Sequence, residues 1–282
     1  MKRIFTTLLL ILASTLLFAQ IPTTNLRLWL RADAGLTTTT GSVINSNWTD
    51  QSSNAISVVR FGSPILVPNA INGKPAVRFP TNGNYFNTSN TAVTNLTGIS
   101  YYAVTKFPST STEVFNKMGQ YGLHALNSGS ARFFTNSINN NELQYNNAGI
   151  IGNYFIYSGI YNSSNISGAL NTTVSSNVNY SSPIPAGGTL YIGGGYNFWS
   201  PSLEIAELII YNDALNTSQQ DQVYNYLAAK YNLGINPNAP TITSFGTLNS
   251  FEPSYFGTRV AQSGFASLSA MSRYCNRKLL RQ

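Results

Sequence analysis

The chain has 282 residues, of which 43% are hydrophobic and 9% are charged, well below the roughly 25% of charged residues that is usual in soluble domains. The formal net charge is +7, but between residues 21 and 237 nine basic side chains stand against eight acidic ones, so the excess lies near the two ends. This balance argues against a nucleic-acid partner, which needs Lys and Arg gathered on the folded surface.

The first twenty residues have the pattern of a secretory signal peptide. Lys2 and Arg3 precede an apolar run, and Ala19 is a small residue suited to cleavage before Gln20. We therefore predict that residues 1–20 are removed and that the protein is secreted or held at the cell surface. The run is short for a membrane span and no other segment could cross a bilayer, so the mature chain is expected to have none. The single cysteine, Cys275, excludes an intrachain disulfide.

Short strand-like segments separated by turn residues follow the leader. The alternation of Leu26, Leu28 and Leu30 predicts a strand with all three on one face. Trp29 and Trp48 lie in strand-like segments and are expected in the core, and residues 167–171 are expected to form a hairpin tip. Further strands are predicted at residues 76–79 after an Asn72–Gly73 turn, 101–107, 153–161 and 189–195. This spacing is typical of an antiparallel sandwich or barrel.

One amphipathic helix follows the last predicted strand. Asn216 is a good N-cap, and Gln219 completes a capping-box pattern. Val223 and Leu227 begin an apolar stripe at helical spacing, and Gly234 is expected to stop the helix. Two prolines then indicate a linker at residues 236–240, and residues 241–282 are either a partial Ig-like module or a disordered tail.

Several of these segments together resemble a known family. They are LWLRADAG at 28–35, WTDQSSNA at 48–55, INGKPAVRF at 71–79, YYAVTKF at 101–107 and IAELIIYNDAL at 205–215. In this order they are similar to the laminin-G-like, concanavalin A-like jelly-roll modules of secreted Bacteroidetes-type bacterial proteins, followed by the start of an Ig-like repeat. The resemblance covers roughly residues 25–233. It implies an all-β fold, a two-sheet antiparallel jelly-roll sandwich with one C-terminal amphipathic helix, over residues 21–235.

Such modules commonly bind glycans, other proteins or cell surfaces. The resemblance therefore implies a secreted, non-catalytic binding module for a carbohydrate or cell-surface ligand, acting in adhesion. Two alternatives stay open, because fold alone does not decide function. Some jelly rolls of the wider group are glycoside hydrolases, and the chain could be a structural spacer from a larger surface adhesin.

Glu204 and Glu207 are the close acidic pair that a hydrolase would need. Retaining glycosidases hold two carboxylates about 5 Å apart, whereas residues three apart in a regular strand point to opposite faces. Only a bulge would bring them together. We therefore assign no catalytic residue, and expect Glu207 to be a structural carboxylate that bonds backbone near the helix.

Metal and triad chemistry has few candidates. His124 is the single histidine, with no acidic residue near it in sequence, and is expected at a surface or half-buried strand position. One His and one tail Cys cannot make a zinc site. A bound Ca²⁺ would need oxygen ligands such as Asp33, Asp50 and Asp213. Each of these is explained equally well as a turn residue that bonds its own backbone.

Aromatic residues give the clearest candidate for ligand binding. Tyr196, Phe198 and Trp199 lie in a Gly/Pro loop at residues 193–202. Their rings could stack on the apolar faces of a sugar while Asn and Ser side chains bond its hydroxyls. In the alternative, Trp199 folds back to cover the edge of the sandwich.

Overall fold

The structure is a computed structural model that describes residues 20–39, 42–108, 112–126, 130–135, 142–145, 149–175, 178–194 and 202–233. The predicted signal peptide, linker and tail lie outside these residues. Within the described part of the chain, no helix is both long and apolar enough to cross a membrane.

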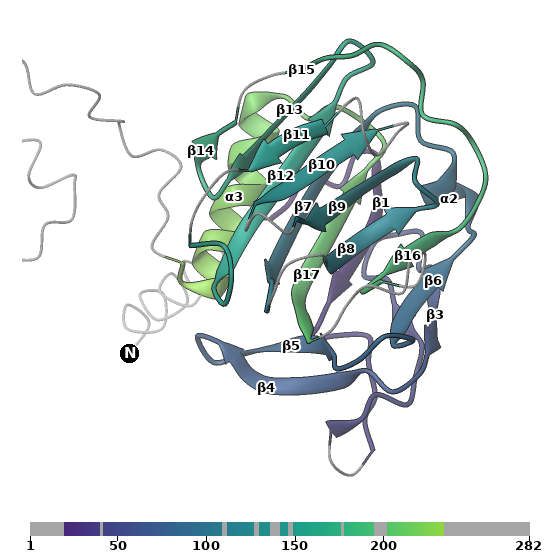
Figure 1. Ribbon diagram of the computed structural model, residues 1–282, viewed down its shortest axis with the longest axis vertical. Coiled ribbons are helices and arrows are strands. Elements are labelled where there is room, and N and C mark those ends of the chain that lie inside the picture. The colour runs from purple at the N-terminus through teal and green to yellow at the C-terminus, as the bar shows by residue number, and fades with distance from the viewer. Residues whose placement is uncertain are drawn as a thin grey trace, which may run out of the picture. The chain divides into compact units, whose positions relative to one another are not determined.

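Two antiparallel β-sheets stack to form the sandwich (Figure 1). The helix-side sheet has the order β14 (Thr173–Val174), β13 (Asn165–Leu170), β12 (Tyr154–Tyr161), β7 (Ile99–Lys106), β17 (Leu203–Tyr211), β5 (Lys74–Phe79) and β4 (Ile65–Ile71). In the same sheet β1 (Leu26–Arg31) pairs with β17, and β15 (Val178–Asn179) pairs with β13. The opposite sheet has the order β11 (Glu142–Tyr145), β10 (Ala131–Thr135), β9 (Tyr121–Ala125), β8 (Thr112–Lys117), β16 (Leu190–Ile192), β6 (Tyr85–Thr88), β3 (Ser57–Phe61) and β2 (Trp48–Thr49). This all-β architecture confirms the predicted jelly-roll sandwich.

The main core fills the space between the two sheets. Leu208 and Ile210 reach it from β17, while Trp48 and Phe86 reach it from the opposite sheet. The rings of Trp48 and Phe86 lie 5.3 Å apart. All four side chains are fully buried, and burying a large apolar side chain stabilises a fold by about 1.5–3 kcal/mol.

The helix α3 (Thr217–Tyr231) covers the outer face of the helix-side sheet, and Figure 1 shows it behind β12 and β13. The predicted capping box is confirmed, because the Gln219 amide donates to Asn216 Oδ1 at 3.0 Å and the Asn216 amide donates to Gln219 Oε1 at 3.0 Å. The apolar stripe is also confirmed, since Val223 and Leu227 are fully buried. The helix ends at Tyr231, followed by Asn232 in the left-handed conformation, a common C-terminal signal.

A second short helix, α2 (Thr91–Thr94), precedes β7. The predicted turn before β5 is confirmed, with Asn72 at φ 46° and Gly73 at φ 81°. Such a pair of positive φ angles matches the twist of a two-residue hairpin. Asn72 Nδ2 also donates to the Tyr231 carbonyl at 2.6 Å, so the hairpin tip holds the end of α3.

Two local predictions are wrong. Leu26 does not share a face with Leu28 and Leu30, because the register of β1 against β17 shifts between Leu26 and Leu28. Leu26 packs with the helix, while the other two leucines lie in the main core. Residues 167–170 are not a hairpin tip but part of β13, and the turn begins at Asn171 with φ 54°.

Candidate binding surfaces

The outer face of the opposite sheet carries three aromatic residues on neighbouring strands. Phe86 points into the core from the middle of β6, so its neighbours Tyr85 and Asn87 point outward. The same alternation turns Tyr191 outward on β16, between the buried Leu190 and Ile192.

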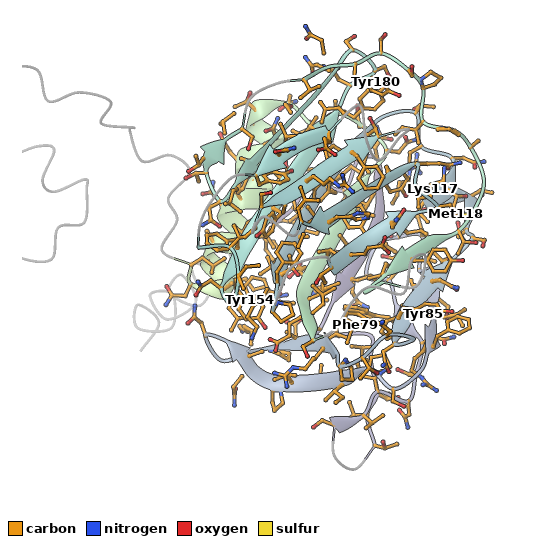
Figure 2. The ribbon with its side chains drawn as sticks, viewed as in Figure 1. Phe79, Tyr85, Lys117, Met118, Tyr154 and Tyr180 are labelled. Carbon is orange, nitrogen blue, oxygen red and sulfur yellow. The ribbon has the colours of Figure 1, made fainter. Side chains whose placement is uncertain are left out.

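Phe61, Tyr85 and Tyr191 form what we call the aromatic strip. Phe61 and Tyr85 are cross-strand partners, and their rings stack 4.7 Å apart with an interplanar angle of 11°. Tyr85 and Tyr191 meet edge to face at 5.8 Å. Figure 2 shows Tyr85 beside β6 at the side of the molecule away from α3.

The strip is partly open to solvent. Phe61 is 38% exposed and its neighbour on the same face, Val59, is 43% exposed. Asn87 pairs with Val59 on one side and with Tyr191 on the other, so an amide lies among these apolar groups. Because Phe61 and Tyr85 stack on each other, a ligand can reach only their outer faces and their edges.

A buried polar group lies further along the same sheet. His124 on β9 pairs with Glu113 on β8, and its Nε2 lies 3.4 Å from Glu113 Oε1. Asn116 Nδ2 donates to the same oxygen at 3.0 Å and lies 3.2 Å from His124 Nε2. Burial, with a smaller contribution from the positive charge of Arg132, lowers the pKa of His124 to about 3. The histidine is therefore neutral at pH 7.

This arrangement differs from the expectation for His124. The residue is 6% exposed, so it is neither at the surface nor half-buried. Its acidic partner comes from the preceding strand, where a register shift between Glu113 and Phe115 sets Glu113 opposite His124. The ring of His124 also meets Phe134 edge to face at 4.8 Å. His124 is therefore a neutral imidazole packed against Phe134 in the sheet.

Glu204 lies at the start of β17 and is surrounded by donors. Arg78 Nε and Nη2 donate to its Oε1 at 2.9 and 2.6 Å. Lys106 Nζ lies 2.9 Å from Oε2, and the Tyr154 hydroxyl donates to the same oxygen. Burial raises the pKa of Glu204, but the hydrogen bonds from Tyr154, Lys106 and Arg78 outweigh this effect, so the pKa is lowered. We call these four residues the Glu204 cluster.

Glu207 is fully buried beneath the end of α3. Trp29 Nε1 donates to its Oε1 at 2.5 Å, while Lys230 Nζ and the Tyr231 hydroxyl donate to Oε2 at 2.7 and 2.8 Å. Its partners are therefore side chains, rather than the backbone groups that we expected. Both oxygens hold the helix against the sheet.

The two glutamates point to the same face of β17, which corrects the expectation of opposite faces. The pairing of β17 with β7 shifts register between Ile205 and Glu207, so Ala206 forms a bulge. The bulge supplies the shared face that a hydrolase would need. However, each carboxylate is buried and bonded to at least one cation.

The three aspartates proposed as calcium ligands lie in three different settings. Asp50 is buried and accepts from the Trp29 amide at 2.7 Å, the Ser52 amide at 2.8 Å, the Ser52 hydroxyl at 2.5 Å and the Ile56 amide at 3.2 Å. Asp33 pairs with Arg31 at 3.0 Å, and Asp213 accepts from Asn25 at 3.1 Å. Among the described residues, no three His, Cys, Asp or Glu side chains gather in a group that could hold a metal ion.

Trp29 and Trp48, which were both expected in the core, differ in environment. Trp48 lies in the main core, as its strand position indicates. Trp29 is only partly buried and faces α3, where its ring meets Tyr226 edge to face at 5.9 Å. The aromatic loop residues Tyr196, Phe198 and Trp199 lie outside the described residues, in the gap between Gly194 and Ser202.

No protein-family model matches the chain, and no curated protein matches it. Solved structures with a similar fold include the binding domain of botulinum neurotoxin serotype D, at 15% identity and a TM-score of 0.55, covering 73% of this chain and 52% of that one. The binding domain of Paraclostridial Mosquitocidal Protein 1 has 12% identity and a TM-score of 0.54, covering 73% and 53%.

A third similar structure is of botulinum neurotoxin type C, whose cell entry is described as dependent upon interaction with two ganglioside molecules. It has 12% identity and a TM-score of 0.53, covering 73% of this chain and 52% of that one. The chain thus spans about half the length of the structures it matches. At these identities the likeness shows the fold alone, which is a β-sandwich of the jelly-roll type.

Proposed function

We propose that the protein is a secreted, non-catalytic binding module whose partner is a glycan, either free or on a cell surface. The observation that carries this proposal is the aromatic strip. Phe61 and Tyr85 stand side by side on a sheet face with Asn87 next to them. Aromatic rings supply a large rigid contact surface for the C–H faces of sugars, and an amide can both donate and accept hydrogen bonds with hydroxyls.

The structural neighbours support a glycan as partner. They include the binding domain of botulinum neurotoxin DC in complex with SialylT and that of serotype D in complex with N-acetylneuraminic acid. The match spans about half of each toxin domain, so it does not indicate which surface of this chain would bind a glycan. We assign that surface from the aromatic strip. The secretory pattern of residues 1–20 supports export.

Hydrolysis is not favoured by the surroundings of Glu204 and Glu207. A general acid in a glycosidase needs a raised pKa and access to the glycosidic oxygen. The pKa of Glu204 is lowered, and Glu207 is fully buried under α3.

Binding to a glycan array and to immobilised neutral polysaccharides tests the proposal. We expect Phe61→Ala and Tyr85→Ala each to weaken retention by about tenfold, which corresponds to about 1.4 kcal/mol. Tyr180→Ala is the matched control, because Tyr180 is also half-buried and packs on Tyr161 at 5.9 Å, away from the strip (Figure 2). The proposal fails if the chain binds no glycan, or if the strip variants bind as well as the parent.

A further inference from the structure

The Glu204 cluster forms one continuous row across the outer face of the helix-side sheet. Tyr154 on β12 pairs with Lys106 on β7, Lys106 pairs with Glu204 on β17, and Glu204 pairs with Arg78 on β5. Figure 2 shows Tyr154 near the lower end of α3, on the other side of the molecule from Tyr85. The row is therefore separate from the aromatic strip.

The charges in this row do not balance. Glu204 remains ionised at neutral pH, because its pKa is lowered. Burial and the bond to Glu204 raise the pKa of Tyr154, so the phenol stays neutral. Arg78 and Lys106 therefore bring two positive charges to one negative charge, which leaves an excess of one positive charge.

The positively charged side chains are the members of this salt-bridge group that are exposed to solvent. The side chain of Glu204 is 2% exposed, whereas those of Arg78 and Lys106 are 40% and 24% exposed. A single cation is enough to neutralise a buried carboxylate, so the second is not required for that purpose. The bonds of Arg78 to Glu204 use Nε and Nη2, and a guanidinium has further N–H donors on Nη1.

The neighbouring carboxylate on the same strand offers a comparison. Glu207 and Asp33 both bind Lys230, at 2.7 and 3.2 Å, and Asp33 also binds Arg31 at 3.0 Å. That group has two negative and two positive charges and is balanced. Ion pairs that only hold parts of the fold together therefore do not require an excess of positive charge such as the one around Glu204.

Resting on the glycan-binding function proposed above, we propose that Arg78 and Lys106 form an anion-binding site for the carboxylate or sulfate group of an acidic polysaccharide. Glu204 fixes the two cations side by side and leaves their remaining donors for the ligand. Charge-assisted bonds from arginine to such oxyanions are short and strong. The side chain of Tyr154, with Lys106 Nζ 5.1 Å from its ring centre, forms one wall of the site.

Elution of the full chain from three immobilised polymers tests this site. Dextran sulfate presents sulfate, polygalacturonate presents carboxylate, and plain dextran presents neither. We expect one or both acidic polymers to retain the chain, and we expect this retention to fall as NaCl is raised. The anion site should contribute no retention on plain dextran. The acidic polymer that retains the chain more strongly identifies the preferred anion.

Arg78→Gln is the main variant, and we expect it to weaken retention on the acidic polymer by about tenfold. The fold should survive, because Lys106 still neutralises Glu204. Lys106→Gln is the second variant, in which Arg78 remains paired with Glu204. Arg78→Lys should give an intermediate loss, because it keeps the charge without the guanidinium fork.

Lys74→Gln is the matched control, because Lys74 is an exposed cation on the same strand as Arg78 and its loss changes the net charge equally. We expect it to change retention by less than about twofold. The site is overturned if Arg78→Gln and Lys106→Gln elute with the parent, or if Lys74→Gln loses as much. Tyr85→Ala should bind acidic polymers normally, so a failed aromatic strip is distinguishable from a failed anion site.

Discussion

Glu204 and Glu207 project from the same face of β17 because Ala206 bulges between them. The shared face places Glu204 beside Arg78 and Lys106, and Glu207 beneath α3. Both carboxylates of β17 act through ion pairs. Glu204 pairs with Arg78 on β5 and Lys106 on β7, and Glu207 pairs with Lys230 on α3.

Replacing Glu207 with Gln should destabilise the protein by about 2–3 kcal/mol, because the largely buried ammonium of Lys230, whose side chain is 10% exposed, loses a partner. Lys230 is left with Asp33 at 3.2 Å as its remaining carboxylate. Urea unfolding followed by circular dichroism measures the change. Lys74→Gln serves again as the exposed control and should stay within about 0.5 kcal/mol of the parent. A loss below about 1 kcal/mol for Glu207→Gln would show that this carboxylate does not hold α3.

Replacing Asn216 with Ala should cost about 1 kcal/mol in the free energy of unfolding. The side chain accepts from the Gln219 amide at 3.0 Å, and alanine leaves that amide without its cap. Asn216→Asp keeps an acceptor at the N-cap and should remain close to the parent. Equal losses for the two variants would contradict a role for the cap.

Stability should fall between pH 6.5 and pH 5 because of His124. Its pKa is about 3 in the folded protein, lowered from 6.5, so the unfolded chain takes up a proton in this range and the folded chain does not. The stabilisation is complete above pH 6.5 and is lost as the pH falls toward 3. Between pH 6.5 and pH 5, the free energy of unfolding should fall by about 2 kcal/mol.

Urea unfolding at several pH values between 5 and 7 measures this slope. The chain has one histidine, so His124→Gln should flatten the slope in this range. A slope that persists in the variant would assign the effect to another group.

Replacing Gly193 with Ala should destabilise the protein more than replacing Gly187. Both have positive φ, at 82° and 75°, and so incur a backbone cost of about 1 kcal/mol. A Cβ at Gly193 would also lie 2.1 Å from Phe79 Cε1, whereas nothing lies within 4 Å at Gly187. We expect a total loss of about 3 kcal/mol for Gly193→Ala. Comparable melting temperatures for the two variants would contradict this packing.

Local patterns predicted the fold class and part of its elements. Apolar alternation or β-branched and aromatic runs identified β1, β5, β7, β12 and β16, whereas strands such as β3, β8 and β10 were not predicted. The spacing of Asn216 and Gln219 identified the start of α3. These signals act within a few residues, so one sequence is enough to reveal them. Two of the errors lie at register shifts, where Leu26 and Ala206 have no side-chain feature that indicates a bulge.

The candidate surfaces were harder to predict, because their members are distant in sequence. Phe61 and Tyr85 each look like a single aromatic residue in a strand, and only the pairing of β3 with β6 makes them a strip. Arg78 reaches Glu204 across 126 residues of chain. Within the hairpin of β8 and β9, a bulge brings Glu113 to His124.

The pairing of β1 with β17 has a consequence for the order of folding. The Trp29 and Glu207 side chains that bond across this pair are separated by 178 residues. In the described part of the chain, β1 pairs with β17, so during synthesis residues 26–31 lack this partner until residues 207–211 have emerged from the ribosome. Contacts of such long range form late and slowly. The N-terminal strand of the domain thus remains without this partner until nearly the whole domain has been synthesised. The sheet is completed only when β17 emerges and pairs with β1.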